Sequence, residues 1–179
     1  MIKRVRELGS DAMIASIEFR EYVEKQETEI NRGLSSLCIL SILVQAGSEG
    51  LHGYKILKEL TEQTSDMLVI EEGTIYPILR KLEEKGIIKS RKEETGRSRK
   101  FYSMTEYGIK IYNHLAGFYS KLTEAIGPLF DVKVNLQAEK YLFCPMCANK
   151  IPLEDKAVKF CDVCGYNMEK ELNERGIKK

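Results

Sequence analysis

The sequence predicts an α+β protein that is mostly α-helical, with a helical domain ending in a two-stranded hairpin and a small C-terminal module organised by cysteines. Three observations lead to this fold class. A short amphipathic segment ends at Gly86 and is followed by two strand-like runs with a basic connection. A longer helical stripe comes after the hairpin, and two Cys-x-x-Cys pairs stand near the C-terminus.

The composition of the 179-residue chain limits the class of protein. Hydrophobic residues make up 43% and charged residues 31%, which is typical of a globular protein with a sizeable core. The net charge is +1, so a nucleic-acid-binding surface must be a local patch. No apolar run approaches the ~20 residues of a membrane helix, and no such run follows the basic N-terminus as in a secretory signal. We expect a cytoplasmic protein without a membrane partner.

Two helices are expected before the first turn. Ser10-Asp11 can cap a helix that runs to about Ile30. Its apolar positions lie on more than one side, so it either contacts a second subunit or packs loosely. Asn31-Arg32-Gly33 breaks the pattern. Residues 34–44 are apolar nearly all round, which predicts a buried helix in which Cys38 is a small core residue.

The next two helices have clearer ends. His52-Gly53-Tyr54 begins the second, with His52 as a capping or packing residue, and the helical pattern fades at Thr64. The third runs from about Gly73 to Lys85, with Pro77 near its first turn and Gly86 in the left-handed position that ends it. Its buried stripe recurs at helical spacing and consists of Ile75, Ile78, Leu79 and Leu82.

The face of the third helix opposite that stripe carries side chains suited to DNA. An α-helix fits the major groove, an Arg can bond the edge of a guanine, and hydroxyls and N-terminal amides can hold phosphate. The alternative is an ordinary solvated helix face. The residues on this face are Thr74, Tyr76, Pro77, Arg80 and Lys81.

The hairpin strengthens the case for DNA. Residues 87–92 and 100–105 are predicted strands, joined by residues 93–97. Residues 86–104 contain six Lys or Arg and two Glu, a net charge of +4, and such charge binds phosphates. Arg97 near the tip can enter a narrow minor groove. A charged hairpin alone is often only solvated, but a helix followed by this hairpin is the order of a winged helix-turn-helix domain, which makes double-stranded DNA the expected ligand.

A long helix is predicted from Thr105-Glu106 to about Gly127-Pro128. Its apolar stripe is more than one helix can bury alone, which favours a homodimer, although packing within the subunit is the alternative. Residues 132–139 have the composition of a linker. The stripe consists of Ile109, Tyr112, Leu115, Phe118, Leu122 and Ile126.

The stretch from Arg32 to Tyr112 resembles the PadR family of transcriptional regulators. The resemblance lies in Leu51-His52-Gly53-Tyr54, Glu72-Gly73-Thr74-Ile75-Tyr76-Pro77, Leu79-Arg80-Lys81-Leu82-Glu83-Glu84-Lys85-Gly86, Arg99-Lys100-Phe101-Tyr102 and Thr105-Glu106-Tyr107-Gly108. It implies a winged helix domain, a dimer formed through terminal helices, and usually repression. It also implies that Thr74, Tyr76 and Pro77 face the major groove and that Arg97, Ser98, Arg99 and Lys100 lie on the wing. Tyr54 and Lys55 complete the candidate DNA contacts, while the acidic Glu71-Glu72 departs mildly from the pattern.

Four of the five cysteines predict a metal site. Cys144 and Cys147 form one Cys-x-x-Cys pair, and Cys161 and Cys164 form another after a gap of 13 residues. Two such pairs give a tetrahedral all-thiolate site that resembles a zinc ribbon, with Gly165 suited to a tight turn and residues 156–160 to a strand. Disulfides do not suit the cytoplasm, and a redox pair would be a single motif in a βαβ unit. We therefore expect one structural Zn²⁺ per chain, with iron as the alternative metal.

The expected organisation has four parts: an N-terminal helix for dimerisation (1–30), the winged helix domain (31–107), a dimerisation helix (108–130) and the zinc ribbon (140–179). The expected function is a dimeric, sequence-specific DNA-binding repressor, with an effector or partner protein left open. The alternative is a general transcription factor resembling the archaeal relative of the transcription factor IIE alpha subunit. We do not expect an enzyme, because His52 and His114 are the only histidines and no Gly-rich phosphate loop occurs.

Overall fold

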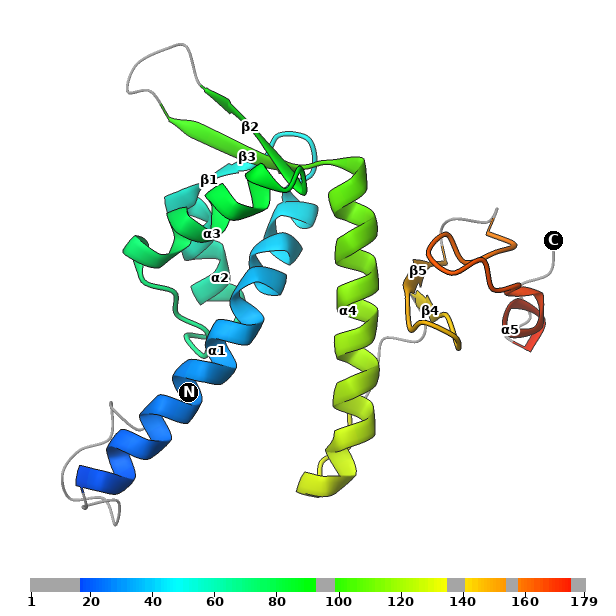
Figure 1. Ribbon diagram of the computed structural model, residues 1–179, viewed down its shortest axis with the longest axis horizontal. Helices are drawn as coiled ribbons and strands as arrows, with labels where there is room; N and C mark the ends of the chain where they lie inside the picture. Colours follow the sequence, from blue (N-terminus) through cyan, green and yellow to red (C-terminus); the bar gives the residue numbers. More distant parts are fainter. Residues whose placement is uncertain (1–16, 93–98, 135–140, 154–157, 175–179) are drawn as a thin grey trace. The chain divides into compact units, whose positions relative to one another are not determined.

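The structure, a computed structural model, describes residues 17–92, 99–134, 141–153 and 158–174 (Figure 1). The chain divides into two compact units, residues 1–108 and residues 109–179, and each is described by itself. No helix among the described residues is long and apolar enough to span a membrane.

The first unit begins with one continuous helix, α1 (Ile17–Ala46), where the sequence predicted two helices. The expected break at Asn31-Arg32-Gly33 is wrong, and the predicted start at Ser10 lies outside the described residues. A mid-helix glycine costs only about 1 kcal/mol, and Ile39 and Leu43 in the same helix are fully buried. The Ser35 hydroxyl also donates to the Asn31 carbonyl at 2.6 Å within the helix. Burial of the C-terminal half thus holds the whole segment helical.

Two shorter helices follow, of which the first packs on α1 and the second packs on the first. Helix α2 (Gly53–Gln63) begins after His52, whose Nδ1 accepts from the Lys55 N–H at 3.3 Å, so the predicted capping role is confirmed. Helix α3 (Glu72–Glu84) follows, and Gly86 takes the predicted left-handed conformation with φ 66°. The core between these helices is formed by Ile39, Leu40, Leu43, Ile56, Leu60, Ile75 and Leu79.

A three-stranded antiparallel sheet completes this unit, in the order β1-β3-β2. Strands β2 (Ile88–Lys92) and β3 (Lys100–Met104) are the predicted hairpin, hereafter the wing, and Ser90 pairs with Tyr102. Strand β1 (Leu51–His52) was not predicted, because two residues carry no recognisable alternation. Gly50 precedes it with φ 68°, and a Cβ there would lie 2.4 Å from the Tyr102 carbonyl oxygen. Only glycine fits that turn.

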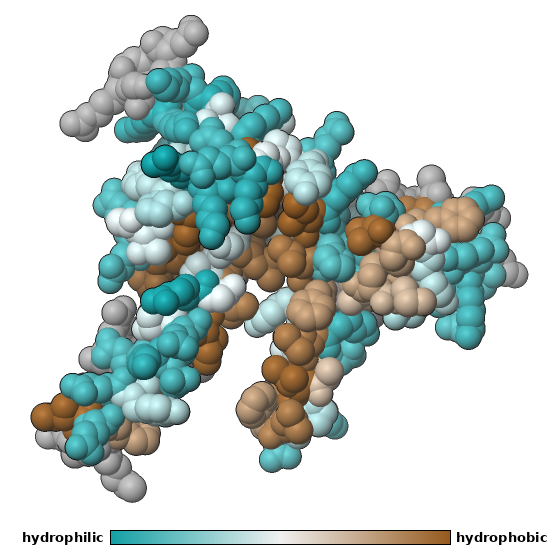
Figure 2. Space-filling view, viewed as in Figure 1, coloured by the Kyte–Doolittle hydropathy of each residue, from teal (hydrophilic) through white to brown (hydrophobic). Residues whose placement is uncertain are grey.

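Helix α4 (Glu106–Ile126) has the predicted extent and is capped by Thr105, whose Oγ1 accepts from the Gly108 N–H at 2.9 Å. From residue 109 it belongs to the second unit, where a short 3₁₀ helix, η2 (Gly127–Phe130), follows it. Much of the predicted stripe is exposed, including Phe118 at 54% and Leu122 at 42%. Figure 2 shows apolar surface along the lower length of this helix.

The rest of the second unit is the cysteine module, residues 140–179. Its described part contains strands β4 (Tyr141–Phe143) and β5 (Lys150–Pro152), which pair antiparallel, and helix α5 (Glu169–Glu174). Of the strand predicted at 156–160, residues 156–157 lie outside the described residues and Phe160 forms only an isolated bridge to Asn167. The core of the module is small and consists of Leu142, Cys144, Ile151, Cys161 and Met168.

Candidate nucleic-acid interface and metal centre

The exposed face of α3 is set by its buried stripe. Ile75, Leu79 and Leu82 are buried, and Ile78 is half-buried. Because an α-helix has 3.6 residues per turn, the residues between these buried positions must face outward. The five predicted DNA-facing residues are indeed all exposed, namely Thr74, Tyr76, Pro77, Arg80 and Lys81. The arrangement presents the first turns of a helix to a ligand, with hydroxyl, aromatic and cationic groups together.

Tyr76 is held in place by a residue that sequence reasoning missed. A Cβ at Gly53 would lie 2.8 Å from Cε1 of the Tyr76 ring, so this ring lies against the first residue of α2. The ring is nevertheless 46% exposed. Nearby, the His52 ring is stacked with the Tyr54 ring, with 6.4 Å between the ring centres, and meets the Phe101 ring edge-on, with 5.7 Å between the ring centres. The Gly53 side of α2 therefore supports the α3 surface, and the glycine between two aromatic residues was the available signal.

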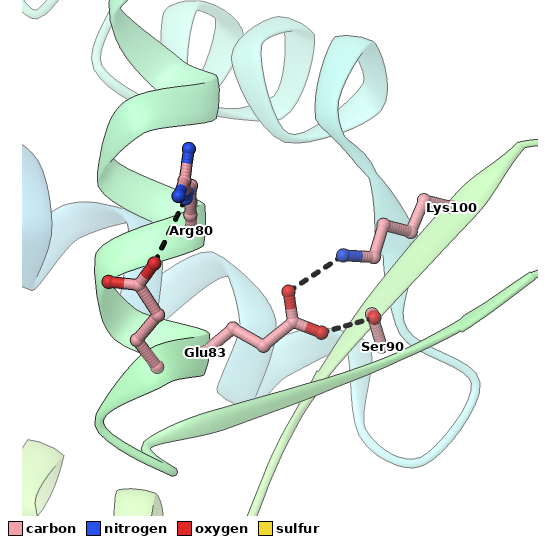
Figure 3. A network of polar contacts seen from close by, with 5 residues as sticks. Arg80, Glu83, Ser90 and Lys100 are labelled. Carbon is pink, nitrogen blue, oxygen red and sulfur yellow. Dashed lines mark hydrogen bonds and ion pairs between the residues drawn. The ribbon is translucent and has the colours of Figure 1, made fainter.

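A second feature missed from the sequence joins α3 to the wing (Figure 3). The carboxylate of Glu83, near the end of α3, accepts a short hydrogen bond from the Ser90 hydroxyl of β2. It also pairs with the Lys100 ammonium of β3 at 2.7 Å. The bond from Lys100, followed by that from Ser90, lowers the pKa of Glu83, and the bond to Glu83 raises the pKa of Lys100. We call these three residues the Glu83 cluster.

The basic residues predicted to contact DNA divide into two groups. In the first, each cation has an acidic partner: Lys55 lies 2.8 Å from Glu59, Arg80 lies 2.9 Å from Glu84, and Lys100 lies on Glu83. Arg91 of the wing also belongs to this group, because it lies 3.9 Å from the Glu49 carboxylate; it donates to the Glu49 carbonyl at 3.1 Å as well and lies over the Phe101 ring. Among Lys55 and the basic residues of α3 and the wing, the exposed cations with no ion-pair partner among the described residues are Lys81, Lys89, Lys92 and Arg99. Arg97 and Ser98 lie outside the described residues.

The four predicted metal ligands converge in the cysteine module. All four sulfur atoms lie within 4.8 Å of one another. Cys144 Sγ is 3.5 Å from Cys164 Sγ, and Cys147 Sγ is 3.6 Å from Cys161 Sγ. These separations exceed the ~2.05 Å of a disulfide. They approach the ~3.8 Å expected between sulfurs placed tetrahedrally about a Zn²⁺ with bonds of about 2.3 Å. The donor set therefore fits a thiolate-bound ion.

The two Cys-x-x-Cys segments have the same backbone hydrogen bonds. Cys144 N–H donates to the Asn149 carbonyl at 2.9 Å, and Cys161 N–H donates to the Tyr166 carbonyl at 2.8 Å. In each segment the residue after the second cysteine is left-handed, Gly165 with φ 74° and Ala148 with φ 59°. The predicted tight turn at Gly165 is confirmed, while the matching turn occurs at an alanine and was not foreseen.

The surroundings of Cys144 and Cys147 disfavour the thiolate form of these two residues. Burial raises the pKa of Cys144, and burial together with the neighbouring thiols raises the pKa of Cys147 to about 12. A backbone hydrogen bond at Tyr166 lowers the pKa of Cys164. A bound cation reverses the effect of burial, because it favours the thiolate form of every ligand. Cys38, by contrast, is half-buried in α1, and burial raises the pKa of its thiol.

Comparison with known proteins matches residues 39–114 to the model of the transcriptional regulator PadR-like family. The chain is similar to the crystal structure of a PadR family transcriptional regulator from Eggerthella lenta, with a TM-score of 0.57 and 26% identity over 65% of this chain and 98% of that one. It is also similar to a transcriptional regulator from Clostridium thermocellum, with a TM-score of 0.51 and 32% identity over 56% of this chain and 96% of that one. An uncharacterized protein from Lysinibacillus sphaericus is 27% identical over 101 residues, which are 55% of this chain and 90% of that protein. The four clustered cysteines lie outside the residues that match the family model.

Proposed function

Because the chain belongs to the PadR-like family of transcriptional regulators, we propose that it is a dimeric repressor that binds a specific operator in the cytoplasm. In this proposal α3 enters the major groove and the wing binds the flanking phosphates. Members of this family are regulators rather than enzymes. The family match favours this function over that of a general transcription factor.

The observation that carries the proposal is the exposed face of α3 together with the unpaired cations of the wing. Thr74, Tyr76 and Pro77 are exposed on the first turns of α3, the part of a recognition helix that contacts base edges. Lys89, Lys92 and Arg99 are exposed on or beside the wing strands, where they can bind phosphates. Contacts of α3 with base edges account for the first set of exposed residues, and contacts of the wing with phosphates account for the second.

The dimer rests on the exposed apolar residues of α4. Leu115, Phe118 and Leu122 expose 41%, 54% and 42% of their surface, respectively, and an apolar surface of this kind marks an interaction site. A two-fold dimer would place two copies of α3 on half-sites about 34–36 Å apart, one turn of DNA. We propose that a second copy of this chain covers these residues.

We further propose that the four cysteines bind one structural Zn²⁺. The sulfur separations fit a tetrahedral ion, and with four thiolates no position is open for catalysis. Iron would be held by the same ligands. Metal analysis of the purified chain decides: one zinc per chain is expected, and a folded, metal-free C-terminus would rule out the site.

The DNA-binding proposal is tested with duplexes that the purified protein selects from a random library. We expect a two-fold-symmetric sequence and an affinity that falls steeply with salt. Tyr76→Ala should weaken binding about 5- to 100-fold, the range for losing a base contact, while the dimer stays folded. Lys81→Gln or Arg99→Gln should each reduce the salt slope by about one per protomer.

Lys110→Gln is the matched control, because Lys110 is also exposed but lies on α4. Its substitution should leave the salt slope unchanged. Selection of no duplex, or equal binding by Tyr76→Ala and the parent, would contradict the proposed interface.

A further inference from the structure

The backbone of the cysteine module contacts α4 at a glycine. Gly117 is buried in the middle of α4, and a Cβ there would lie 1.9 Å from the Ala148 carbonyl oxygen and 2.7 Å from the Lys150 nitrogen. Both atoms are backbone, so no side-chain movement could relieve such an overlap. The first Cys-x-x-Cys pair and the residue after it, residues 144–148, are hereafter called the first cysteine segment. The backbone of this segment therefore lies directly against the helix.

Side chains on both sides of Gly117 continue this contact. The Lys121 ammonium lies over the Phe143 ring at 5.4 Å, and the Lys150 ammonium lies 5.9 Å from the Tyr112 ring centre. Such cation–π contacts favour one placement of the two elements. Strand β4, strand β5 and the first cysteine segment thus all contact α4.

The residue that contacts α4 directly follows a metal ligand. Ala148 comes after Cys147, and its left-handed conformation and its N–H bond to the Cys144 carbonyl at 2.8 Å are part of the metal-binding turn. The position of the Ala148 carbonyl is therefore set by the cysteine site. Without a metal, the described part of the module has only a few core residues and two strands of three residues each. Modules of this size usually need a metal to fold.

The contact at Gly117 and two of the exposed apolar residues, Leu115 and Leu122, lie on different sides of α4, although Lys150 of the module also reaches Tyr112 of the stripe. At about 100° per residue, Lys121 falls on the same side as Gly117, whereas Leu115 and Leu122 lie roughly 140–160° around the helix. The module therefore leaves these apolar residues open while it covers the opposite side of the same helix. Most of the stability of a helix in a protein comes from packing against other elements rather than from intrinsic propensity, so the contact with the module bears on whether α4 stays ordered.

We propose that metal occupancy of the four-cysteine site controls DNA binding by this chain, through the contact of the module with α4. With the metal bound, the first cysteine segment holds α4 and the dimer forms. When the metal leaves, the Ala148 contact is lost, α4 loosens and the affinity for the operator falls. This inference rests on the proposed DNA-binding dimer and its metal site, and it assigns that regulator a transition-metal ion as its controlling ligand.

The geometry of the site permits such control. Cys144 and Cys161 are buried, but Cys164 is exposed. A competing ligand can therefore reach the ion from the Cys164 side. This exposure suits a site whose occupancy follows the supply of metal.

The first experiment uses the full chain and its selected duplex. Dimer dissociation by analytical ultracentrifugation and DNA affinity by fluorescence anisotropy are measured with Zn²⁺ present, after removal by a chelator, and after Zn²⁺ is restored. We expect removal to weaken DNA binding roughly 5- to 150-fold, the usual range of coupling between two sites, and restoration to reverse it. Unchanged dimerisation and affinity after the zinc has left would overturn the inference.

The second experiment separates the route through α4 from metal binding itself. The Gly117→Ala variant should retain one zinc per chain, yet it should bind DNA and dimerise as weakly as the parent protein after its zinc has been removed. Alanine is a better helix former than glycine, so a loss cannot come from helix propensity. Gly33→Ala is the control, because Gly33 also lies in a helix and a Cβ there meets nothing within 4 Å. Parent-like DNA binding by zinc-loaded Gly117→Ala would overturn the proposed route.

The outcomes also separate this inference from the function on which it rests. If the untreated chain selects no duplex or holds no metal, the proposed function itself fails, and the inference fails with it. If the chain binds both DNA and zinc but the two are independent, only the inference is overturned.

Discussion

Lys100 illustrates how the structure separates two roles for one basic residue. The sequence predicts a DNA contact, whereas the structure places its ammonium on Glu83 at 2.7 Å. We consider the variants Lys100→Met and Glu83→Gln, singly and together. If the Glu83 cluster joins α3 to the wing, the two changes should be coupled in stability and should leave the number of phosphate contacts unchanged.

The exposure of the pair sets the expected magnitude. The side chains of Lys100 and Glu83 are 42% and 31% exposed, so the pair falls in the range of partly exposed ion pairs, about 0.2–1 kcal/mol. Glu83 also accepts a hydrogen bond from Ser90, and such a bond contributes roughly 1 kcal/mol. We therefore expect Lys100→Met to cost about 0.5–1 kcal/mol and Glu83→Gln about 1–2 kcal/mol. The coupling energy of the cycle should be about 0.5–1 kcal/mol.

The coupling should depend on pH in a defined direction. The pKa of Glu83 is lowered in the folded protein from its ordinary value of 4.5. Its contribution is therefore fully present above pH 4.5 and is lost as the pH falls through the lower, folded pKa. The pKa of Lys100 is raised from 10.5, so the contribution of Lys100 is present below pH 10.5 and is lost only as the pH rises through the higher, folded pKa.

Urea unfolding of the four proteins, followed by circular dichroism, measures this coupling at pH 7 and at pH values below 4.5. The cycle cancels acid effects elsewhere in the chain. In DNA binding, Lys100→Met should leave the salt slope unchanged, while Arg99→Gln reduces it. A slope reduced by about one per protomer in Lys100→Met, with no coupling in stability, would refute the structural role and restore the DNA contact.

Three further changes test the local geometry by urea unfolding or metal retention. Thr105→Ala removes the hydroxyl that accepts a backbone N–H of α4 at 2.9 Å, and it should cost about 1 kcal/mol; no loss would argue against the cap. Ala148→Gly relieves a φ of 59°, so the site should hold its metal more strongly against a chelator, by about 1–2 kcal/mol; faster loss would contradict the strain. Gly47 has a φ of 61° and open space around it, so Gly47→Ala should lower the free energy of unfolding by about 1–2 kcal/mol. Gly50 has a φ of 68°, and a Cβ there would also lie 2.4 Å from the Tyr102 carbonyl oxygen, so Gly50→Ala should cost clearly more. Equal losses of stability would show that the protein relieves this close approach.

The sequence predicted α3 and the wing closely because periodicity determines both. A stripe at i, i+3, i+4 and i+7 fixes which side of a helix is buried, and hence that Tyr76 and Arg80 are exposed. The same kind of reasoning failed at Asn31-Arg32-Gly33, because a local propensity of about 1 kcal/mol competes with the burial of several large residues. Strand β1 was missed for a related reason, since its two residues pair only because β3 offers them an edge.

Side-chain pairing and close approach were not predictable in the same way. Glu83 lies seven residues from Ser90 and seventeen from Lys100, so nothing in the local pattern joins them. The cysteine spacing predicted the cluster, because each Cys-x-x-Cys fixes two sulfurs locally. The sequence did not reveal the contact of the module with Gly117. A single glycine within a helical pattern does not indicate a contact, and only the structure places the Ala148 carbonyl against it.

The pairing of cations changes the expected strength of the electrostatic interaction with DNA. Counting every basic residue of α3, of the wing and at Lys55 gives nine per protomer and eighteen per dimer, which predicts a salt slope of about −16 at −0.9 for each phosphate contact. The structure leaves Lys81, Lys89, Lys92 and Arg99 without acidic partners among the described residues. With Arg97, whose side chain is not described, five remain per protomer, and ten per dimer predict a slope of about −9. Titrations of the selected duplex between 50 and 200 mM salt distinguish the two slopes. A slope of about −9 corresponds to a loss of affinity of roughly 10⁵-fold over this range, and a slope of about −16 to a loss of almost 10¹⁰-fold. A slope near −16 would mean that DNA displaces the acidic partners, and the ion pairs at Arg80 and Lys100 would then belong only to the free protein.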